Sequence, residues 1–302
     1  MPEGVTTVIA TRSRPELLRR AVASILSQDY EGPIEIVVVF DGTDVDELSD
    51  VRPPENRRIR TTRNVRTPGL AGARNTGIDV AAHAYTAFCD DDDEWKPGKL
   101  ASQIKLLDDD SVIVAATGIE IHSTGGVHER LAPSRVTLDD LLRSRITELH
   151  PSSFLFRTVD LRGRLGWIDE ALPASYGEDY DLLLRAAKLG PIDAVGEALT
   201  VVHWDRTSFF SERWQGIVDG LSYLLDKHPE FERSKVGQAR IEGQIAFAHA
   251  ALGNRRGART WAWRTLRHSP IQPRAYIAML VGLRLARGET VVAALNKRGR
   301  GM

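Results

Sequence analysis

The first hundred residues alternate short apolar runs with stretches of helical periodicity. Four apolar runs predict strands, of which the third is the weakest: Val5–Ala10, Ile34–Phe40, Ile59–Thr62 and Tyr85–Phe88. Ile34–Phe40 is apolar at every position except Glu35, as is typical of a central parallel strand covered on both faces. Apolar residues recur at helical spacing after Pro15, and Ala73–Ala82 predicts a second helix. Strands separated by helices predict βαβ units, and therefore an α/β fold with a mostly parallel central sheet and flanking helices.

The C-terminal part has a different pattern, because helical periodicity replaces the strands from about Val236 onward. Three helices are predicted there, at Ile241–Leu252, Ala258–Leu266 and Ala275–Ala286, with breaks at Gly253 and Pro270–Pro273. We therefore expect two parts. Residues 1–215 would form the α/β domain, and residues 216–302 would form a helical C-terminal region.

Composition and charge narrow the class of protein. The single cysteine, Cys89, excludes internal disulfides and a cysteine-only zinc site. The net charge of -1 gives no indication of nucleic-acid binding, but residues 254–302 hold eleven Lys/Arg and one acid. No signal segment precedes the first strand, and no apolar stretch reaches the roughly 18 residues that span a membrane. These features predict a cytoplasmic protein.

The strongest chemical feature is the run of four carboxylates Asp90–Asp93, directly after an apolar strand. Adjacent carboxylates repel one another, and Mn²⁺ or Mg²⁺ would relieve that repulsion and bridge to substrate phosphates. The alternative interpretation is a solvated acidic turn before a helix at Lys99–Leu107.

Two further acidic features lie at ends of predicted elements. Asp41 and Gly42 follow the strand Ile34–Phe40, where a carboxylate could contact a nucleotide or simply form a turn. Glu178 and Asp179 follow Gly177 at the start of a predicted helix, where an acid could accept a proton or only cap the helix.

Together these segments resemble the family 2 glycosyltransferases of the GT-A fold. The similar segments span about residues 4–190 and occur in the family's order: Ala10–Pro15, Phe40–Thr43, Gly72–Gly77, Asp90–Asp92 and Gly177–Asp179. The resemblance implies an inverting transfer of one sugar from a UDP-, GDP- or dTDP-linked donor, with Mn²⁺ or Mg²⁺ as cofactor. The acceptor would be a glycan, a lipid-linked saccharide or a small molecule.

The resemblance also assigns roles to individual residues. The donor-binding set would be Ala10, Thr11, Arg12, Arg14, Asp41, Arg74, Asp90 and Asp91, with Asp41 at the nucleobase and Arg74 near the diphosphate. Asp90 and Asp92 would hold the cation, with His203 as a further ligand. Asp179 would be the general base, with Glu178 as the alternative acid.

The chain departs from the family pattern at three positions. Ala10 and Phe40 replace the usual Pro and first Asp, so the base-binding edge is less polar than usual. Phe210 stands where processive members have Gln before Arg213 and Trp214, which favours transfer of a single sugar. A non-catalytic relative that only binds a nucleotide sugar remains an alternative.

Two other enzyme classes are excluded by missing residues. A haloacid-dehalogenase-type phosphatase needs a nucleophilic carboxylate two residues before Asp41, but that residue is Val39. A sugar nucleotidyltransferase needs a glycine-rich loop after the first strand, and Ala10–Pro15 contains no glycine.

The basic C-terminal region permits two interpretations. The apolar stretch Tyr276–Leu283 is surrounded by Arg274, Arg284, Arg287, Lys297, Arg298 and Arg300. It forms either a helical cap on the catalytic domain or an interfacial segment in peripheral contact with an anionic membrane.

Overall fold

The computed structural model describes residues 2–204 and 214–286. The chain divides into two compact units. The first comprises Met1–Leu138, Ile146–Glu170 and Glu178–Arg206, and the second comprises Asp139–Arg145, Ala171–Gly177 and Thr207–Met302. The units interleave along the sequence, and the division expected at residue 215 remains a prediction.

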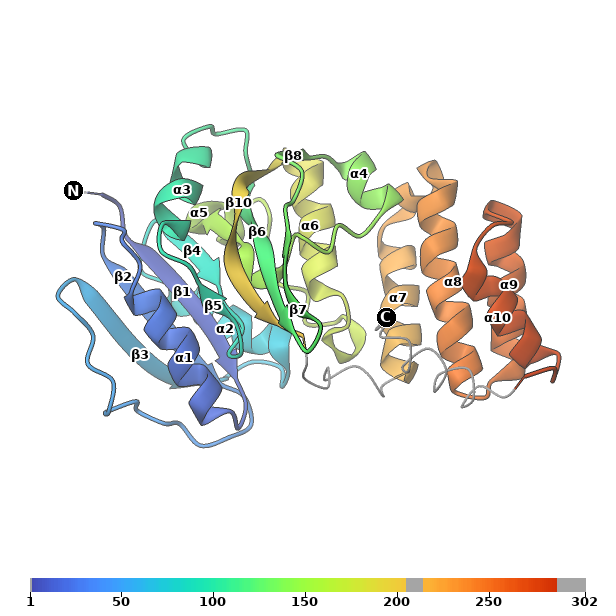
Figure 1. Ribbon diagram of the computed structural model, residues 1–302, viewed down its shortest axis with the longest axis horizontal. Helices are drawn as coiled ribbons and strands as arrows, with labels where there is room; N and C mark the ends of the chain where they lie inside the picture. Colours follow the sequence, from blue (N-terminus) through green and yellow to red (C-terminus); the bar gives the residue numbers. More distant parts are fainter. Residues whose placement is uncertain (1, 205–213, 287–302) are drawn as a thin grey trace. The chain divides into compact units, whose positions relative to one another are not determined.

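One sheet organises the first unit (Figure 1). Among the described residues its ten strands are β1 (Val5–Thr11), β2 (Ile34–Phe40), β3 (Arg57–Arg63), β4 (Tyr85–Phe88), β5 (Glu94–Trp95), β6 (Val114–Ser123), β7 (Gly126–Arg130), β8 (Arg135–Val136), β9 (Leu155–Arg157) and β10 (Ile192–His203). Their order is β3-β2-β1-β4-β9-β6-β10-β5, with β7 beside β6 and β8 beside β10. Strands β3, β2, β1 and β4 run parallel, as do β6 and β10, whereas β9 is antiparallel to both of its neighbours. The predicted α/β class with a mostly parallel sheet is confirmed.

Helices cover both faces of this sheet because the central strands are apolar on both sides. All seven residues of β2 are buried, as its largely apolar run predicted, and Glu35 is buried with them. On one face, Ile9 of β1 packs in a core with residues of α1 (Pro15–Leu26) and α3 (Lys99–Leu106). On the other face, Val8 lies against Gly77 of α2 (Leu70–Val80), where an added Cβ would come within 2.2 Å of the valine. Gly77 therefore allows α2 to lie close to β1.

Three shorter or later elements complete the first unit. They are the 3-10 turn η1 (Pro151–Ser153), α5 (Thr158–Arg162) and α6 (Glu178–Leu189). The predicted helix Ala73–Ala82 begins at Leu70 in the structure, because Gly69, with φ 124°, turns the chain into the helix earlier. Parallel strands of this sheet end where α2 and the acidic run begin, so this edge is where a ligand is expected.

The second unit is helical, as the C-terminal periodicity predicted. Its elements are α4 (Leu138–Arg143), η2 (Pro173–Ser175), α7 (Trp214–Lys227), η3 (Pro229–Arg233), α8 (Lys235–Ala251), α9 (Arg255–His268) and α10 (Pro273–Gly282). Helices α8, α9 and α10 share a core made largely of alanine, which allows close packing of their backbones. Asn254 caps α9 by accepting a hydrogen bond from the Gly257 amide at 3.0 Å, which explains the predicted break.

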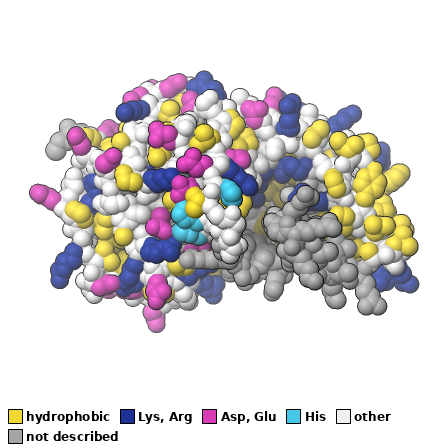
Figure 2. All heavy atoms as spheres, in the orientation of Figure 1, with side chains coloured by type: hydrophobic (Ala, Val, Ile, Leu, Met, Phe, Trp, Pro, Cys, Tyr) yellow, Lys and Arg dark blue, Asp and Glu magenta, His cyan; other side chains and the backbone are white. Residues whose placement is uncertain are grey.

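Apolar side chains also reach the surface of α9 and α10 (Figure 2). Trp263 of α9 is 61% exposed, and Tyr276, Leu280 and Leu283 at α10 are about half exposed. Among the described helices, none is long and apolar enough to cross a membrane.

Candidate active site

The acidic run occupies the loop between β4 and β5, and its four carboxylates face two groups of partners. Asp91 accepts a hydrogen bond from Thr11 Oγ1 at 2.7 Å, while Arg14 Nη1 lies 3.1 Å from Asp91 Oδ1. The same Arg14 nitrogen lies 2.8 Å from Asp92 Oδ2. The structure thus joins the end of β1 to the middle of the acidic run, and it brings together four predicted site residues.

The other two carboxylates meet a histidine that the sequence did not point to. Potential ligand atoms of Asp90, Asp93 and His150 all lie within 4.8 Å of one another. Ser152 Oγ donates to Asp93 Oδ2 at 2.5 Å and accepts from the Asp90 amide at 2.9 Å. Burial and the nearby Asp90 carboxylate raise the pKa of Asp93 well above its usual range. Two carboxylates and an imidazole form a donor set that fits Mn²⁺.

A buried arginine connects this group with the start of α6. Arg74 on α2 forms ion pairs of 2.7 Å with Asp90 through Nη2 and 2.7 Å with Glu178 through Nη1. Burial raises the pKa of Glu178 to about 7, even though the Arg74 charge opposes that rise. Asp179 follows directly, is 9% exposed, and contributes to the electrostatic field at both Arg74 and His150. Three segments distant in sequence are therefore brought to one place.

Asp41 lies at the end of β2, where it holds the approach to α2. Its Oδ1 accepts from Asn64 Nδ2 at 2.8 Å, and its Oδ2 accepts from the Gly69 amide at 3.1 Å. The loop that it holds passes so close to Gly72 that an added Cβ would lie 1.9 Å from the Thr67 carbonyl oxygen. Asp41 thus supports the loop geometry, and its nucleobase contact remains a prediction.

A cavity of about 230 Å³ lies beside the same strand ends. Its wall is formed by Thr11, Ser13, Arg14, Pro15, Leu18, Phe40, Thr43, Asp44 and Asp46. Phe40 supplies an apolar side where the family usually has a carboxylate. Thr43 Oγ1 is buried and has no hydrogen-bond partner among the described residues, so a ligand could satisfy it. Of the other predicted residues near this edge, Arg12 is exposed and Ala10 is half-buried.

His203 ends β10 in a separate group of charged side chains. Its Nε2 lies 2.9 Å from Glu94 Oε1 and 3.0 Å from Arg20 Nη2. Its ring centroid lies 5.3 Å from that of His122. The structure does not place His203 with Asp90, Asp93 and His150, and its predicted role as a metal ligand remains a prediction.

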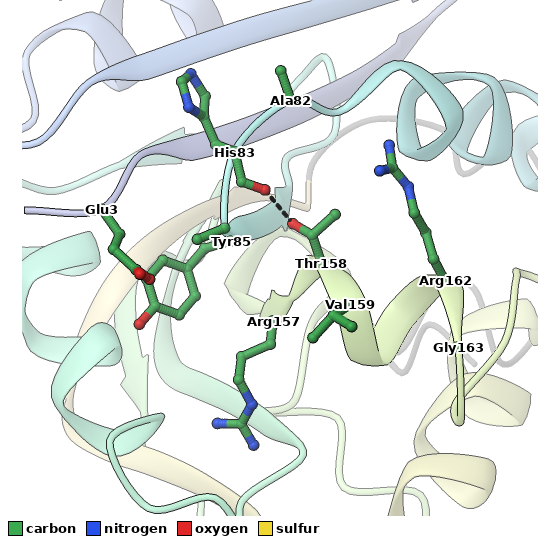
Figure 3. Close-up of a pocket in the computed structure, with 10 residues that line it drawn as sticks. Glu3, Ala82, His83, Tyr85, Arg157, Thr158, Val159, Arg162 and Gly163 are labelled. Atoms are coloured by element: carbon green, nitrogen blue, oxygen red, sulfur yellow. Dashed lines mark hydrogen bonds between the residues drawn. The ribbon is translucent and has the colours of Figure 1, made fainter.

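A second cavity, of about 750 Å³, lies at the opposite, amino ends of β1 and β4 (Figure 3). His83 and Thr158 lie in its wall, where the Thr158 hydroxyl donates to the His83 carbonyl at 2.7 Å. Arg157 and Arg162 also line it, but both guanidinium groups donate to backbone carbonyls. Both guanidinium groups are therefore used by the fold, and the acid in this wall is Glu3 rather than a residue of the acidic run.

Comparison with known proteins decides the family. The sequence model described as Glycosyl transferase family 2 matches residues 6–163, which is more than half of the chain. The chain belongs to glycosyltransferase family 2. The predicted family is confirmed, and the match covers the strand ends, Arg74 and the acidic run described above.

Two curated relatives of this family 2 chain are named for an activity or a pathway. It is 33% identical over 110 residues to the Escherichia coli UDP-Glc:alpha-D-GlcNAc-diphosphoundecaprenol beta-1,3-glucosyltransferase WfaP, covering 36% of this chain and 43% of the relative. It is 32% identical over 203 residues to the Rhizobium meliloti succinoglycan biosynthesis protein ExoO, covering 62% and 56% respectively. The chain thus spans about half the length of these relatives.

Solved structures share the fold at low sequence identity. Staphylococcus aureus TarS 1-349 in complex with UDP-GlcNAc is 15% identical with a TM-score of 0.60, covering 98% of this chain and 92% of that one. The Pyrobaculum calidifontis mannosyltransferase PcManGT in complex with GDP-Man and Mn²⁺ is 18% identical with a TM-score of 0.57, covering 100% and 89%. This likeness confirms the GT-A fold.

Proposed function

We propose that this family 2 chain transfers one sugar from a nucleotide-diphosphate donor to an acceptor hydroxyl, with inversion at the anomeric carbon. The observation that carries the proposal is the pair of bonds made by Arg74. They join Asp90, at the end of β4, to Glu178, at the start of α6. Asp90, which is proposed to face the donor, and Glu178, which directly precedes the proposed base Asp179, therefore both pair with one buried guanidinium group.

The donor would lie along the strand ends. The cavity beside Phe40 is proposed to take the nucleobase, with Thr11 in its wall and with Arg12 and Asp41 adjacent in sequence to residues of that wall. Asp90 would hold a divalent cation. The geometry of the site favours Asp93 and His150 as its co-ligands. The position of the family motif favours Asp92 instead. When bound, Mn²⁺ or Mg²⁺ supplies positive charge that favours departure of the nucleoside diphosphate. The bound Mn²⁺ in PcManGT supports this assignment.

Asp179 is proposed to accept the proton of the acceptor hydroxyl. The acceptor oxygen forms a bond to the sugar C1 as the bond from C1 to the diphosphate oxygen breaks, and the proton passes to the Asp179 carboxylate. A single displacement from the opposite face inverts C1. Glu178 is less suited to this role, because its carboxylate is buried and already paired with Arg74.

Transfer of a single sugar remains part of the proposal on sequence grounds alone. Phe210, which distinguishes the chain from processive members, and Arg213, which it shares with them, lie outside the described residues. The donor base also stays open between UDP, GDP and dTDP. UDP-GlcNAc and GDP-Man are both bound by proteins of similar fold.

Calorimetry with UDP-, GDP- and dTDP-sugars, with and without Mn²⁺, tests donor binding. We expect one base to bind in a Mn²⁺-dependent manner, and we expect that donor to be consumed when an acceptor is supplied. Binding without any turnover would favour the alternative of a non-catalytic nucleotide-sugar-binding relative. Absence of binding by every donor would contradict both proposals.

We also propose that the basic C-terminal helices make peripheral contact with an anionic membrane that carries the acceptor. Residues 254–286 contain seven arginines and no acid. Arg256, Trp263 and Arg267 share one face of α9 at helical spacing, and all three are exposed. Basic residues near such a surface contribute about 1 kcal/mol each. A diphosphoundecaprenol-linked acceptor, like the one in the name of WfaP, would be presented there. The cytoplasmic location remains a prediction.

Liposome sedimentation tests this contact. The parent should sediment with anionic vesicles at low salt and remain in the supernatant with neutral vesicles. The variant Arg256→Glu/Arg267→Glu should lose sedimentation, whereas the control Arg58→Glu, at an exposed arginine of β3, should keep it. Equal recovery of parent and variant in the supernatant would favour a helical cap and a soluble acceptor.

A further inference from the structure

A lysine with no exposed surface lies behind the acidic run. Lys99 is the first residue of α3 and is 0% exposed. Its Nζ donates to Gln103 Oε1 at 2.7 Å and lies 3.9 Å from the centroid of the Trp95 ring. Both partners are neutral, and burial lowers the pKa of Lys99 to about 7. Burying an ammonium group without a carboxylate costs several kcal/mol, so stability alone gives no reason for a lysine here.

Both partners of Lys99 hold the same short segment of backbone. Trp95 Nε1 donates to the Ser152 carbonyl at 2.8 Å. Gln103 Nε2 donates to the Ser153 carbonyl at 2.6 Å and to the Ala115 carbonyl at 2.7 Å. The ammonium group therefore fixes the two side chains that position η1.

That segment in turn holds the candidate cation ligands. Ser152 Oγ bonds to the Asp93 carboxylate and to the Asp90 amide, and His150 Nδ1 lies 3.3 Å from Asp93 Oδ2. A shift of Ser152 would move all three groups relative to one another. Partners that orient metal ligands without touching the metal typically change metal affinity by about 10–100-fold when removed.

We propose that Lys99 is a positioning residue of the cation site, acting through Trp95 and Gln103 on the Ser152–Ser153 backbone. The role rests on the proposed function, since it concerns the cation that the donor diphosphate would meet. The ammonium group is suited to it because it donates to Gln103 and attracts the Trp95 ring at the same time. An apolar side chain of equal length would fill the space but would leave both partners unfixed.

The test compares Mn²⁺ affinity with fold stability in the full chain. Lys99→Met should weaken Mn²⁺ binding by about tenfold, measured by electron paramagnetic resonance of free Mn²⁺ without nucleotide. Its melting temperature should stay equal or rise, because a buried ammonium group is removed. Gln103→Glu should form an ion pair with Lys99 but lose donation to the Ser153 and Ala115 carbonyls, so its Mn²⁺ affinity should also fall. A role limited to stability would move the melting temperature instead.

Gln28→Met is the matched control. Gln28 is also a buried glutamine beside α3, but its side chain bonds to the Lys96 carbonyl and the Leu100 amide rather than to η1. Its Mn²⁺ affinity should stay within about twofold of the parent. If both Lys99→Met and Gln103→Glu bind Mn²⁺ as tightly as the parent, the positioning role of Lys99 is wrong, while the cation assignment of the proposed function stands. A parent that binds no Mn²⁺ would overturn the cation assignment of the proposed function, and this role with it.

Discussion

Replacing Arg74 with Met tests the buried connection on which the site depends. The side chain is 3% exposed and pairs at 2.7 Å with Glu178, which is 6% exposed, and with Asp90, which is 27% exposed. Removing one partner of a buried ion pair typically costs about 3–5 kcal/mol, because the remaining charge is left without compensation. Most of that cost should come from Glu178, since solvent screens the more exposed Asp90.

The stability lost in Arg74→Met should depend on pH, and this dependence follows from the pKa of Glu178. In the folded parent this pKa is raised from 4.5 to about 7, so the folded state binds the proton more tightly than the unfolded state. The Glu178 contribution to stability is therefore complete below pH 4.5 and declines as pH rises to about 7. Without Arg74 the pKa rises further, and the decline extends to higher pH. Arg74→Met should thus cost about 3–5 kcal/mol at pH 8 and clearly less at pH 5.5.

Urea unfolding in EDTA, followed by circular dichroism, measures the free energy of unfolding of parent and variant at pH 8 and at pH 5.5. The double variant Arg74→Met/Glu178→Gln should have a free energy of unfolding roughly 1–3 kcal/mol higher than that of Arg74→Met, because the two residues interact directly. Arg135→Met is the control: it breaks a pair with Asp193 in which the arginine is 54% exposed to screening solvent, worth about 1 kcal/mol or less. A loss below about 1 kcal/mol for Arg74→Met at pH 8, or an equal loss at both pH values, would refute this reasoning.

Three further predictions concern neighbouring residues. Asp92→Ala and Asp93→Ala should each weaken Mn²⁺-dependent donor binding in calorimetry, and normal affinity in Asp93→Ala would contradict the grouping with Asp90 and His150. His203→Ala should leave Mn²⁺ affinity within about twofold, because His203 contacts Glu94 and Arg20, whereas a loss of about 10–100-fold would support the sequence prediction. Although burial acts to raise it, hydrogen bonds from Asn75, Thr67 and Arg66 lower the pKa of Glu170 to about 2, below the usual 4.5. Glu170 thus contributes stability above pH 4.5 that is lost toward pH 2, and Glu170→Gln should unfold with a smaller dependence on pH in that range; an unchanged dependence would rule this out.

The sequence predicted the elements whose patterns are local. Strands β1, β2 and β4 are short, almost wholly buried segments rich in apolar residues, so the apolar pattern identifies each of them. The acidic run and the start of α6 were found because acids at element ends are visible in the sequence itself. The start of α2 was placed three residues late, since Gly69 and Leu70 carry no periodic signal.

The missed site residues depend on contacts between distant segments. His150 and Ser152 reach Asp90 and Asp93 only because β9 pairs with β4, with Leu155 opposite Ala87. No spacing in the sequence marks a lone histidine as part of such a group. Lys99 was likewise treated as an ordinary helix residue, because lysine is rarely fully buried and its neighbours give no sign that it is. The ion pairs of Arg14 with the acidic run also required the fold.

The most direct test of the proposed reaction is release of nucleoside diphosphate from a panel of UDP-, GDP- and dTDP-sugars in Mn²⁺, measured for the parent, Asp179→Asn and Glu178→Gln. The account predicts release by the parent from donors of one base. It predicts release slowed by about 10²–10⁴-fold in Asp179→Asn with donor affinity unchanged, the usual effect of losing a general base. Parent-like release by Asp179→Asn, with no release by Glu178→Gln, would contradict the assignment of the base. Absence of release from every donor by the parent, with acceptor present, would contradict the transferase itself.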